Sequence, residues 1–116
     1  MASTRRIEKL NMLLREEISK ILDRDIEVSE GTMLTVTRVA ISSDGQYATV
    51  FVSLLGKNPK EALEILKKSV YYIQQVLNRR VRMRPVPKIH FEIDEAEFQR
   101  EKVERSLAKL KQKGEM

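Results

Sequence analysis

The sequence contains no cysteine and no tryptophan, and only one histidine, four glycines and three prolines among 116 residues. The lack of cysteine excludes disulfides, thiolate nucleophiles and thiolate metal sites together. No apolar run approaches the roughly 20 residues that a membrane-spanning helix needs. The first residues pass straight into a mixed charged and apolar pattern, which differs from a secretory signal. We therefore expect a cytoplasmic protein that has no membrane partner.

Groups that carry catalysis are equally scarce. The single histidine, His90, falls on the expected outward side of a short strand, which favours a surface residue over a general base. There is no Gly-rich phosphate loop and no cluster of His, Asp and Glu at metal-ligand spacing. Acidic pairs such as Glu16-Glu17 fall on solvated helix faces, and the serines have no base partner. We expect no enzymatic activity, no cofactor and no small-molecule substrate.

The positive charge is concentrated in one stretch of the chain. Residues 1–56 carry 7 basic and 8 acidic side chains, residues 57–90 carry 9 and 2, and residues 91–116 carry 6 and 7. The whole net charge of +5 therefore arises from the middle segment. Such a footprint favours a polyanionic partner, although chance clustering on a solvated surface is the alternative.

Apolar spacing predicts the first half of the fold. An amphipathic helix is expected over about residues 4–23, followed by two β-like runs at 34–41 and 47–54. The turn sequence at 42–45 ends in Asp-Gly, which predicts a β-hairpin. In the first strand the apolar phase slips at Arg38, which predicts a bulge.

A long second helix is predicted from Pro59 to about Arg80. Asn58 is expected as its N-cap and Glu61 as the acid of a capping box. Because this helix can return the chain parallel to the second strand, the sheet is expected to be mixed, with the helices on one face.

The remaining elements follow two prolines, Pro85 and Pro87, which end helical structure. Alternation over 89–93 predicts a third strand. A C-terminal helical extension is expected over residues 96–116, so that residues 1–95 form one α+β domain.

Arginines are densest where the long helix passes into the third strand. Arg79, Arg80, Arg82, Arg84 and Lys88 lie within ten residues. Because guanidinium groups grip phosphate at two points, these residues favour nucleic acid over a diffuse acidic protein. One or two of these arginines could instead stabilise the helix C-terminus.

Two further pairs on the same helix extend this candidate surface. Lys67 and Lys68 lie about three turns before the arginines. Tyr71 and Tyr72 lie between, where bases could stack on their rings, although packing inside the protein is the commoner role of tyrosine. The alternative to an RNA-binding protein is an adaptor whose basic face meets an acidic protein.

Several motifs resemble ribosome-binding factor A, a family with the type II KH fold. They are Val39-Ala40-Ile41-Ser42-x-Asp44, Ala48-x-Val50-Phe51-Val52 and Arg84-x-x-Pro87-x-Ile89-x-Phe91-x-x-Asp94. The resemblance covers nearly the whole chain and implies the order helix-strand-strand-helix-helix-strand. Where the family has an Ala-x-Gly kink, this chain has Ser69-Val70-Tyr71, so the glycine is missing.

The resemblance also implies a function and a partner. Members of the family bind the immature small ribosomal subunit, assist late maturation of its rRNA and matter most in the cold. We expect a KH-like, RNA-binding monomer that acts in ribosome biogenesis and rRNA processing. The residues predicted to contact RNA are Lys67, Lys68, Ser69, Tyr71, Tyr72, Arg79, Arg80, Arg82, Arg84 and Lys88.

Overall fold

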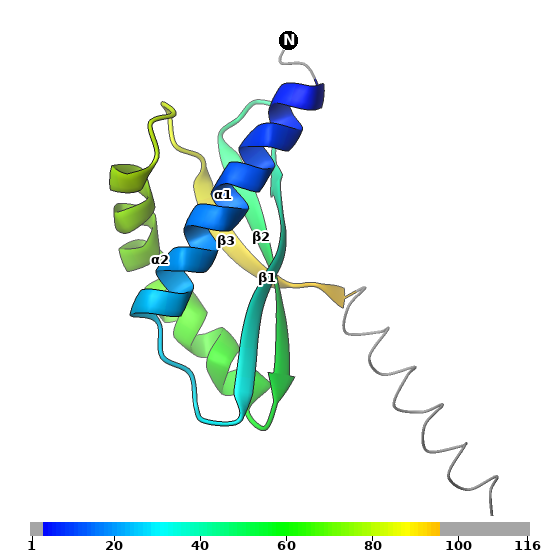
Figure 1. Cartoon of the computed structure of the whole chain (residues 1–116), viewed down its shortest axis with the longest axis vertical. Coiled ribbons are helices and arrows are strands. Elements are labelled where there is room, and N and C mark those ends of the chain that lie inside the picture. Colours follow the sequence, from blue (N-terminus) through cyan, green and yellow to red (C-terminus); the bar gives the residue numbers. More distant parts are fainter. Residues whose placement is uncertain (1–3, 96–116) are drawn as a thin grey trace, which may run out of the picture.

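Two helices cover one face of a three-stranded sheet in the computed structural model, which describes residues 4–95 (Figure 1). The predicted C-terminal helix lies outside the described residues. The elements are α1 (Thr4–Asp25), β1 (Thr32–Ile41), β2 (Tyr47–Gly56), α2 (Pro59–Arg80) and β3 (Lys88–Ile93). The order predicted from apolar spacing is confirmed over the described residues, whereas the two consecutive helices that the resemblance implied before the last strand are one continuous helix, α2.

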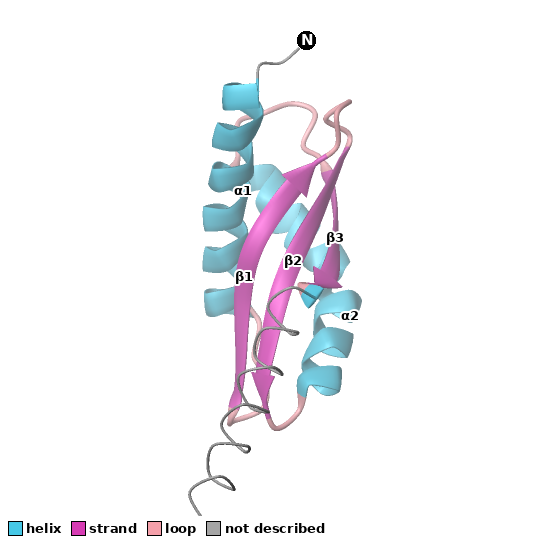
Figure 2. Ribbon diagram, turned by 90° about the vertical axis from the view of Figure 1, so that its right-hand side faces the viewer, coloured by secondary structure: helices cyan, strands magenta, loops and turns pink. Residues whose placement is uncertain are grey.

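The sheet is mixed, as predicted. Its strand order is β1-β2-β3, with β1 antiparallel to β2 and β3 parallel to β2. Figure 2 shows the three strands side by side with α1 and α2 on the same side of the sheet. The long helix α2 supplies the crossover that a parallel pair of strands requires.

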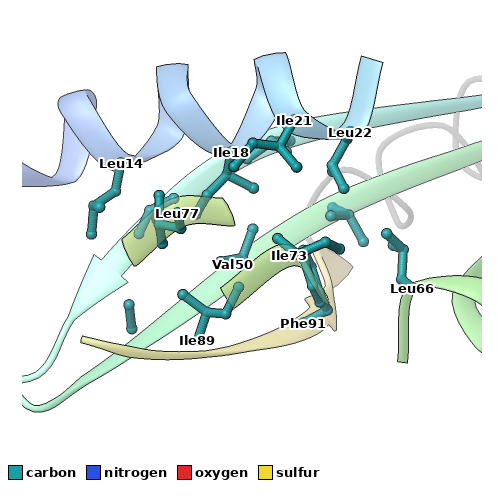
Figure 3. Packing of buried hydrophobic residues seen from close by; sticks show 14 of the residues in the cluster. Leu14, Ile18, Ile21, Leu22, Val50, Leu66, Ile73, Leu77, Ile89 and Phe91 are labelled. Atoms are coloured by element: carbon teal, nitrogen blue, oxygen red, sulfur yellow. The ribbon is translucent and has the colours of Figure 1, made fainter. Parts of the chain in front are cut away.

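The core lies between the helices and the sheet. Leu14, Ile18 and Ile21 of α1 lie over Val50 of β2 (Figure 3). Val52 of β2 belongs to the same cluster, and all five side chains are fully buried. From α2, the side chains that are fully shielded from solvent are Leu66, Ile73 and Leu77. The clean alternation of β2 therefore separates a buried side from an open side, as its sequence predicted.

The turn between β1 and β2 is built by its own side chains. The hydroxyl of Ser42 donates to the carboxylate of Asp44 at 2.6 Å, and that carboxylate also accepts from the amide of Gln46 at 3.1 Å. These two bonds lower the pKa of Asp44, the Ser42 hydroxyl contributing most. Gly45 has a φ of +73°. The motif Ser42-x-Asp44 is thus explained by turn chemistry.

The start of α2 differs from the predicted capping in two respects. Asn58 occupies the N-cap position but its side chain makes no capping hydrogen bond, and its φ of −131° and ψ of 62° are irregular for a cap. The predicted capping box is also wrong, because the carboxylate of Glu61 accepts a hydrogen bond of 2.8 Å from the hydroxyl of Ser29 instead. Pro59 does occupy the first turn, as predicted.

The predicted bulge in β1 is confirmed and is tied to the end of β3. The pairing of β1 with β2 shifts between Val36 and Arg38, leaving Thr37 as the extra residue. The hydroxyl of Thr37 lies 2.7 Å from the carboxylate of Asp94, which is only 6% exposed. The guanidinium of Arg38 lies 3.7 Å from the same carboxylate and 3.8 Å from the centre of the Phe51 ring.

Replacing Thr37 by valine should therefore destabilise the domain. The substitution keeps the shape of the side chain but leaves a buried carboxylate short of one donor, which costs about 1–3 kcal/mol. Thr49→Val is the matched control, because within residues 4–95 the hydrogen-bond partner of the Thr49 hydroxyl is the exposed His90, at 3.1 Å. Urea unfolding should show a lower free energy for Thr37→Val, and equal losses in both variants would contradict the role of Asp94.

Candidate nucleic-acid interface

The solvent-facing side of α2 divides into three rows, because side chains three and four positions apart share a row on a helix. One row faces α1, one faces β3 and one points outward between them. The residues predicted to bind RNA are distributed over all three rows and over the connection to β3. The structure therefore separates residues that the sequence grouped together.

The row that faces α1 is engaged in contacts between the two helices. The hydroxyl of Tyr72 donates to the carboxylate of Asp25 at 3.1 Å, and the guanidinium of Arg80 donates to Glu17 at 2.7 Å. The bond to Asp25 raises the pKa of Tyr72. Ser69, which is half-buried, lies one turn before Tyr72 on the same row. Tyr72 and Arg80 thus hold α2 against α1 in this structure.

The Glu17–Arg80 pair should make stability depend on pH in a defined window. The hydrogen bond from Arg80 and the nearby charges of Arg80 and Lys20 lower the pKa of Glu17 from its ordinary 4.5, although desolvation opposes them. A carboxyl whose pKa is lower in the folded than in the unfolded protein stabilises the fold fully at any pH above its pKa in the unfolded protein. That stabilisation is lost as the pH falls through its pKa in the folded protein.

We therefore expect Arg80→Met to reduce the free energy of unfolding near neutral pH by less than about 1 kcal/mol, as for other partly exposed pairs. The difference from the parent chain should stay constant down to about pH 5 and shrink below about pH 4.5. Arg79→Met is the control, because Arg79 is exposed and adjacent. A difference that persists unchanged in acid, measured by urea unfolding, would exclude Glu17 as the partner.

The row that faces β3 carries one of the predicted cations. The side-chain amide of Gln74, in this row, accepts a hydrogen bond from the backbone amide of Ile89 and donates one to the carbonyl of Pro87, at the start of β3. Lys67, two turns earlier, is exposed and lies beside Phe91 and Ile93. Lys67 therefore points along a different side of α2 from Arg80.

The outward row brings together three predicted residues that remain accessible. Lys68, Tyr71 and Arg79 are all exposed, and Gln75 lies between the last two. The Tyr71 side chain is 75% exposed, more than any other large apolar or aromatic side chain noted on the described surface. From Lys68 to Arg79 the row is about 17 Å long at 1.5 Å per residue. A row of two cations flanking an open ring can contact phosphates and stack on a base.

Two arginines in the connection from α2 to β3, Arg82 and Arg84, differ in their contacts. Arg84 donates to the carbonyl oxygens of Asn78, Val81 and Met83 at 3.2, 3.0 and 2.7 Å, so its guanidinium closes the C-terminus of α2. This agrees with the expectation that some arginines here stabilise the helix end. Arg82 is exposed and lies two residues beyond the end of α2.

Lys88 lies on the opposite side of the molecule from the helices. It is exposed and pairs with Tyr47 across β2 and β3, on the open face of the sheet. His90 is exposed on the same face, as predicted. Lys88 therefore stands apart from the outward row of α2.

Two cations beside this surface were missed from the sequence. Arg24 and Lys20 of α1 lie next to Asp25 and Glu17, on the edge of α1 that meets α2. The positive charge of Arg24 also acts on the Tyr72 hydroxyl. The acidic neighbours of these residues brought the N-terminal segment close to neutrality, so the charge count alone could not single them out.

Other chemistry is not seen in the described part of the chain. Within residues 4–95 there is no group of three or more His, Asp or Glu side chains placed to hold a metal ion. No described helix is long and apolar enough to cross a bilayer.

The comparisons with known proteins converge on one family. The sequence model of the ribosome-binding factor A family matches residues 6–107 of this chain. The chain belongs to the ribosome-binding factor A family. Ribosome-binding factor A of Prochlorococcus marinus (strain NATL1A) is 41% identical over 98 residues, which cover 81% of this chain and 80% of its relative. The protein of Clostridium novyi (strain NT) is 36% identical over 111 residues, 93% of this chain and 92% of its own.

Solved structures of the family share the fold. The crystal structure of ribosome-binding factor A from Thermus thermophilus superimposes with a TM-score of 0.66 at 26% identity, covering 75% of this chain and 94% of that one. A Thermus thermophilus model fitted into the cryo-EM map of a complex with the 30S subunit has a TM-score of 0.66 at 29% identity, covering 75% and 93%. That family member therefore binds the small ribosomal subunit.

Proposed function

We propose that this protein is an assembly factor that binds the immature small ribosomal subunit and assists late maturation of its rRNA. Family membership carries the proposal, since a Thermus member was fitted into a 30S complex. The basic surface of α2 supports it physically. The chain acts in the cytoplasm as a monomer, in which residues 1–95 are the RNA-binding domain.

The contact surface that we propose runs along the outward row of α2 and over its C-terminal end. Lys68, Arg79 and Arg82 supply exposed cations, and Tyr71 supplies an open ring. Such contacts give salt-dependent affinity with little sequence choice. Arg80, Arg84 and Tyr72 act indirectly, because they hold α2 and its end in place for the residues that touch RNA.

The mechanism needs no chemical step. Binding to one conformation of the rRNA more tightly than to others shifts the population toward that conformation by the difference in affinity. A difference of about 2–3 kcal/mol shifts the balance roughly 30- to 150-fold. Release follows when maturation removes the favoured conformation. We accordingly propose a protein that is not an enzyme and that acts without a cofactor.

Co-sedimentation with immature and mature small subunits across a salt series tests this function. We expect the full chain to bind immature subunits more tightly and to lose affinity steeply as salt rises. Binding with no salt dependence would indicate apolar contacts and would reject the basic surface of α2 as the docking surface. Failure of the folded chain to bind either subunit would reject the proposal.

A further inference from the structure

The outer edge of β3 offers unpaired backbone groups. The amide of Lys88 bonds to Gln46 and the amide of Asp94 bonds to Val52, so even-numbered residues of β3 point their amides at β2. In a strand, successive residues point their backbone groups to opposite sides. The amides and carbonyls of Ile89, Phe91 and Ile93 therefore point away from β2. Figure 2 shows β3 at this edge of the sheet, beside α2.

The first part of this edge is already occupied by a side chain. The amide of Ile89 donates to Oε1 of Gln74 at 2.9 Å, and Nε2 of Gln74 donates to the carbonyl of Pro87 at 3.1 Å. Gln74 thus pairs with β3 as one peptide group of a neighbouring strand would. Beyond it, within residues 4–95, the backbone amides of Phe91 and Ile93 have no hydrogen-bond partner.

A groove opens beside these two amides, between the end of β3 and the N-terminal half of α2. Its lining residues are Leu63, Lys67, Phe91, Glu92, Ile93 and Glu95. Ile93 is on the helix-facing side of β3 and yet 38% exposed, because no described element covers it. With Leu63 and Phe91 it gives the groove an apolar floor.

The other side of the same edge is acidic. The side chain of Glu92 lies on the open face of the sheet and is 56% exposed, with His90 at 3.4 Å. Glu95 is exposed at the end of the groove. Two carboxylates against the single ammonium of Lys67 make this groove less suited to a phosphate backbone than the outward row of α2 is.

We propose that this groove binds an extended peptide of a protein partner as a fourth strand, with alternating apolar and basic side chains. The alternation follows from the pleat: a strand beside β3 places every second side chain over the floor of Leu63, Phe91 and Ile93, and the others beside Glu92. Main-chain hydrogen bonds to Phe91 and Ile93 supply affinity, and the two faces supply the choice of sequence. The proposal does not depend on the RNA-docking function.

The test uses the full chain labelled for NMR and the synthetic peptide acetyl-Lys-Val-Lys-Val-Lys-Val-amide. A block peptide, acetyl-Lys-Lys-Lys-Val-Val-Val-amide, has the same composition without the alternation, and a hexauridylate supplies a single-stranded RNA. The decisive variant is Ile93→Pro, with Ile93→Val as its control. Proline at 93 removes an amide that points into the groove and leaves the β2–β3 hydrogen bonds in place, as edge strands tolerate.

We expect the alternating peptide to shift the amide signals of Phe91 and Ile93 and to slow their hydrogen exchange. Binding should weaken at least tenfold for the block peptide and for Ile93→Pro, and stay within about twofold for Ile93→Val. Glu92→Lys should weaken binding similarly to Ile93→Pro. If hexauridylate shifts these two amide signals and the peptide does not, the groove binds RNA and the proposal is overturned. If both amides are already protected from hydrogen exchange in the full chain without peptide, another segment of the chain occupies this edge and the proposal is also overturned.

Discussion

Replacing Gly56 by alanine is expected to remove much of the domain's stability. Gly56 ends β2 at a φ of +114° and pairs with Thr32 at the start of β1. A Cβ atom there would overlap the carbonyl oxygen of Gly31 and lie 3.0 Å from the Cα of Thr32. Both obstacles are backbone atoms, which cannot rotate away. Separating them would break the hydrogen bond from Lys57 to Gly31.

The expected cost combines two effects. A side chain at positive φ costs roughly 1–2 kcal/mol, and displacing paired backbone brings the total to about 3 kcal/mol or more. For a domain of this size the melting temperature should fall by at least about 12 °C. Thermal unfolding followed by circular dichroism measures the loss of stability and the fall in melting temperature.

Gly45→Ala is the matched control for this substitution. Gly45 also has a positive φ, of +73°, but no atom lies within 4 Å of its ideal Cβ position. The conformational cost alone applies there, roughly 1–2 kcal/mol. Equal losses in the two variants would show that the Gly31 backbone can move aside, and that the end of the hairpin is looser than its close approach indicates.

Local chemistry made much of the fold predictable. The alternation of β2, the Ser42–Gly45 turn and the phase slip at Arg38 each depend on residues close together in sequence, and all three are confirmed. The capping box at Glu61 was wrong because its partner, Ser29, is 32 residues away and competes for the same carboxylate. A cap motif predicts what a side chain can do locally and leaves out such tertiary competitors.

The candidate site was predictable as a segment but not as a surface. The sequence showed a basic stretch, yet Arg80 depends on Glu17, which is 63 residues distant. The role of Arg84 depends on how the chain turns after α2 so that three carbonyls converge on it. Arg24 was hidden by its acidic neighbours. Which arginines remain for a partner therefore follows only from the packing of α1 against α2.

Reversing the charges of Arg79 and Arg82 is expected to abolish most of the affinity for the immature subunit. Both side chains are exposed, whereas Arg80 and Arg84 have intramolecular partners whose loss would also disturb α2. The double variant Arg79→Glu, Arg82→Glu should therefore fold normally. Each phosphate contact adds roughly 0.7–0.9 to the slope of log affinity against log salt concentration, so the slope should fall by about 1.4–1.8.

The loss of affinity follows from the same relation. At about 0.1 M salt, two phosphate contacts raise the affinity roughly 30- to 60-fold relative to its value at 1 M salt. The new carboxylates also repel the phosphates, which brings the expected loss of affinity to about 100-fold. Lys57→Glu, Lys60→Glu is the control: it changes the net charge equally, at the other end of α2, roughly 30 Å away. We expect that control to retain binding within about threefold, apart from the general charge effect. If both variants lose affinity alike in co-sedimentation, overall charge governs binding. If neither does, the RNA contact lies on another face, with Lys88 on the open side of the sheet the first residue to reverse.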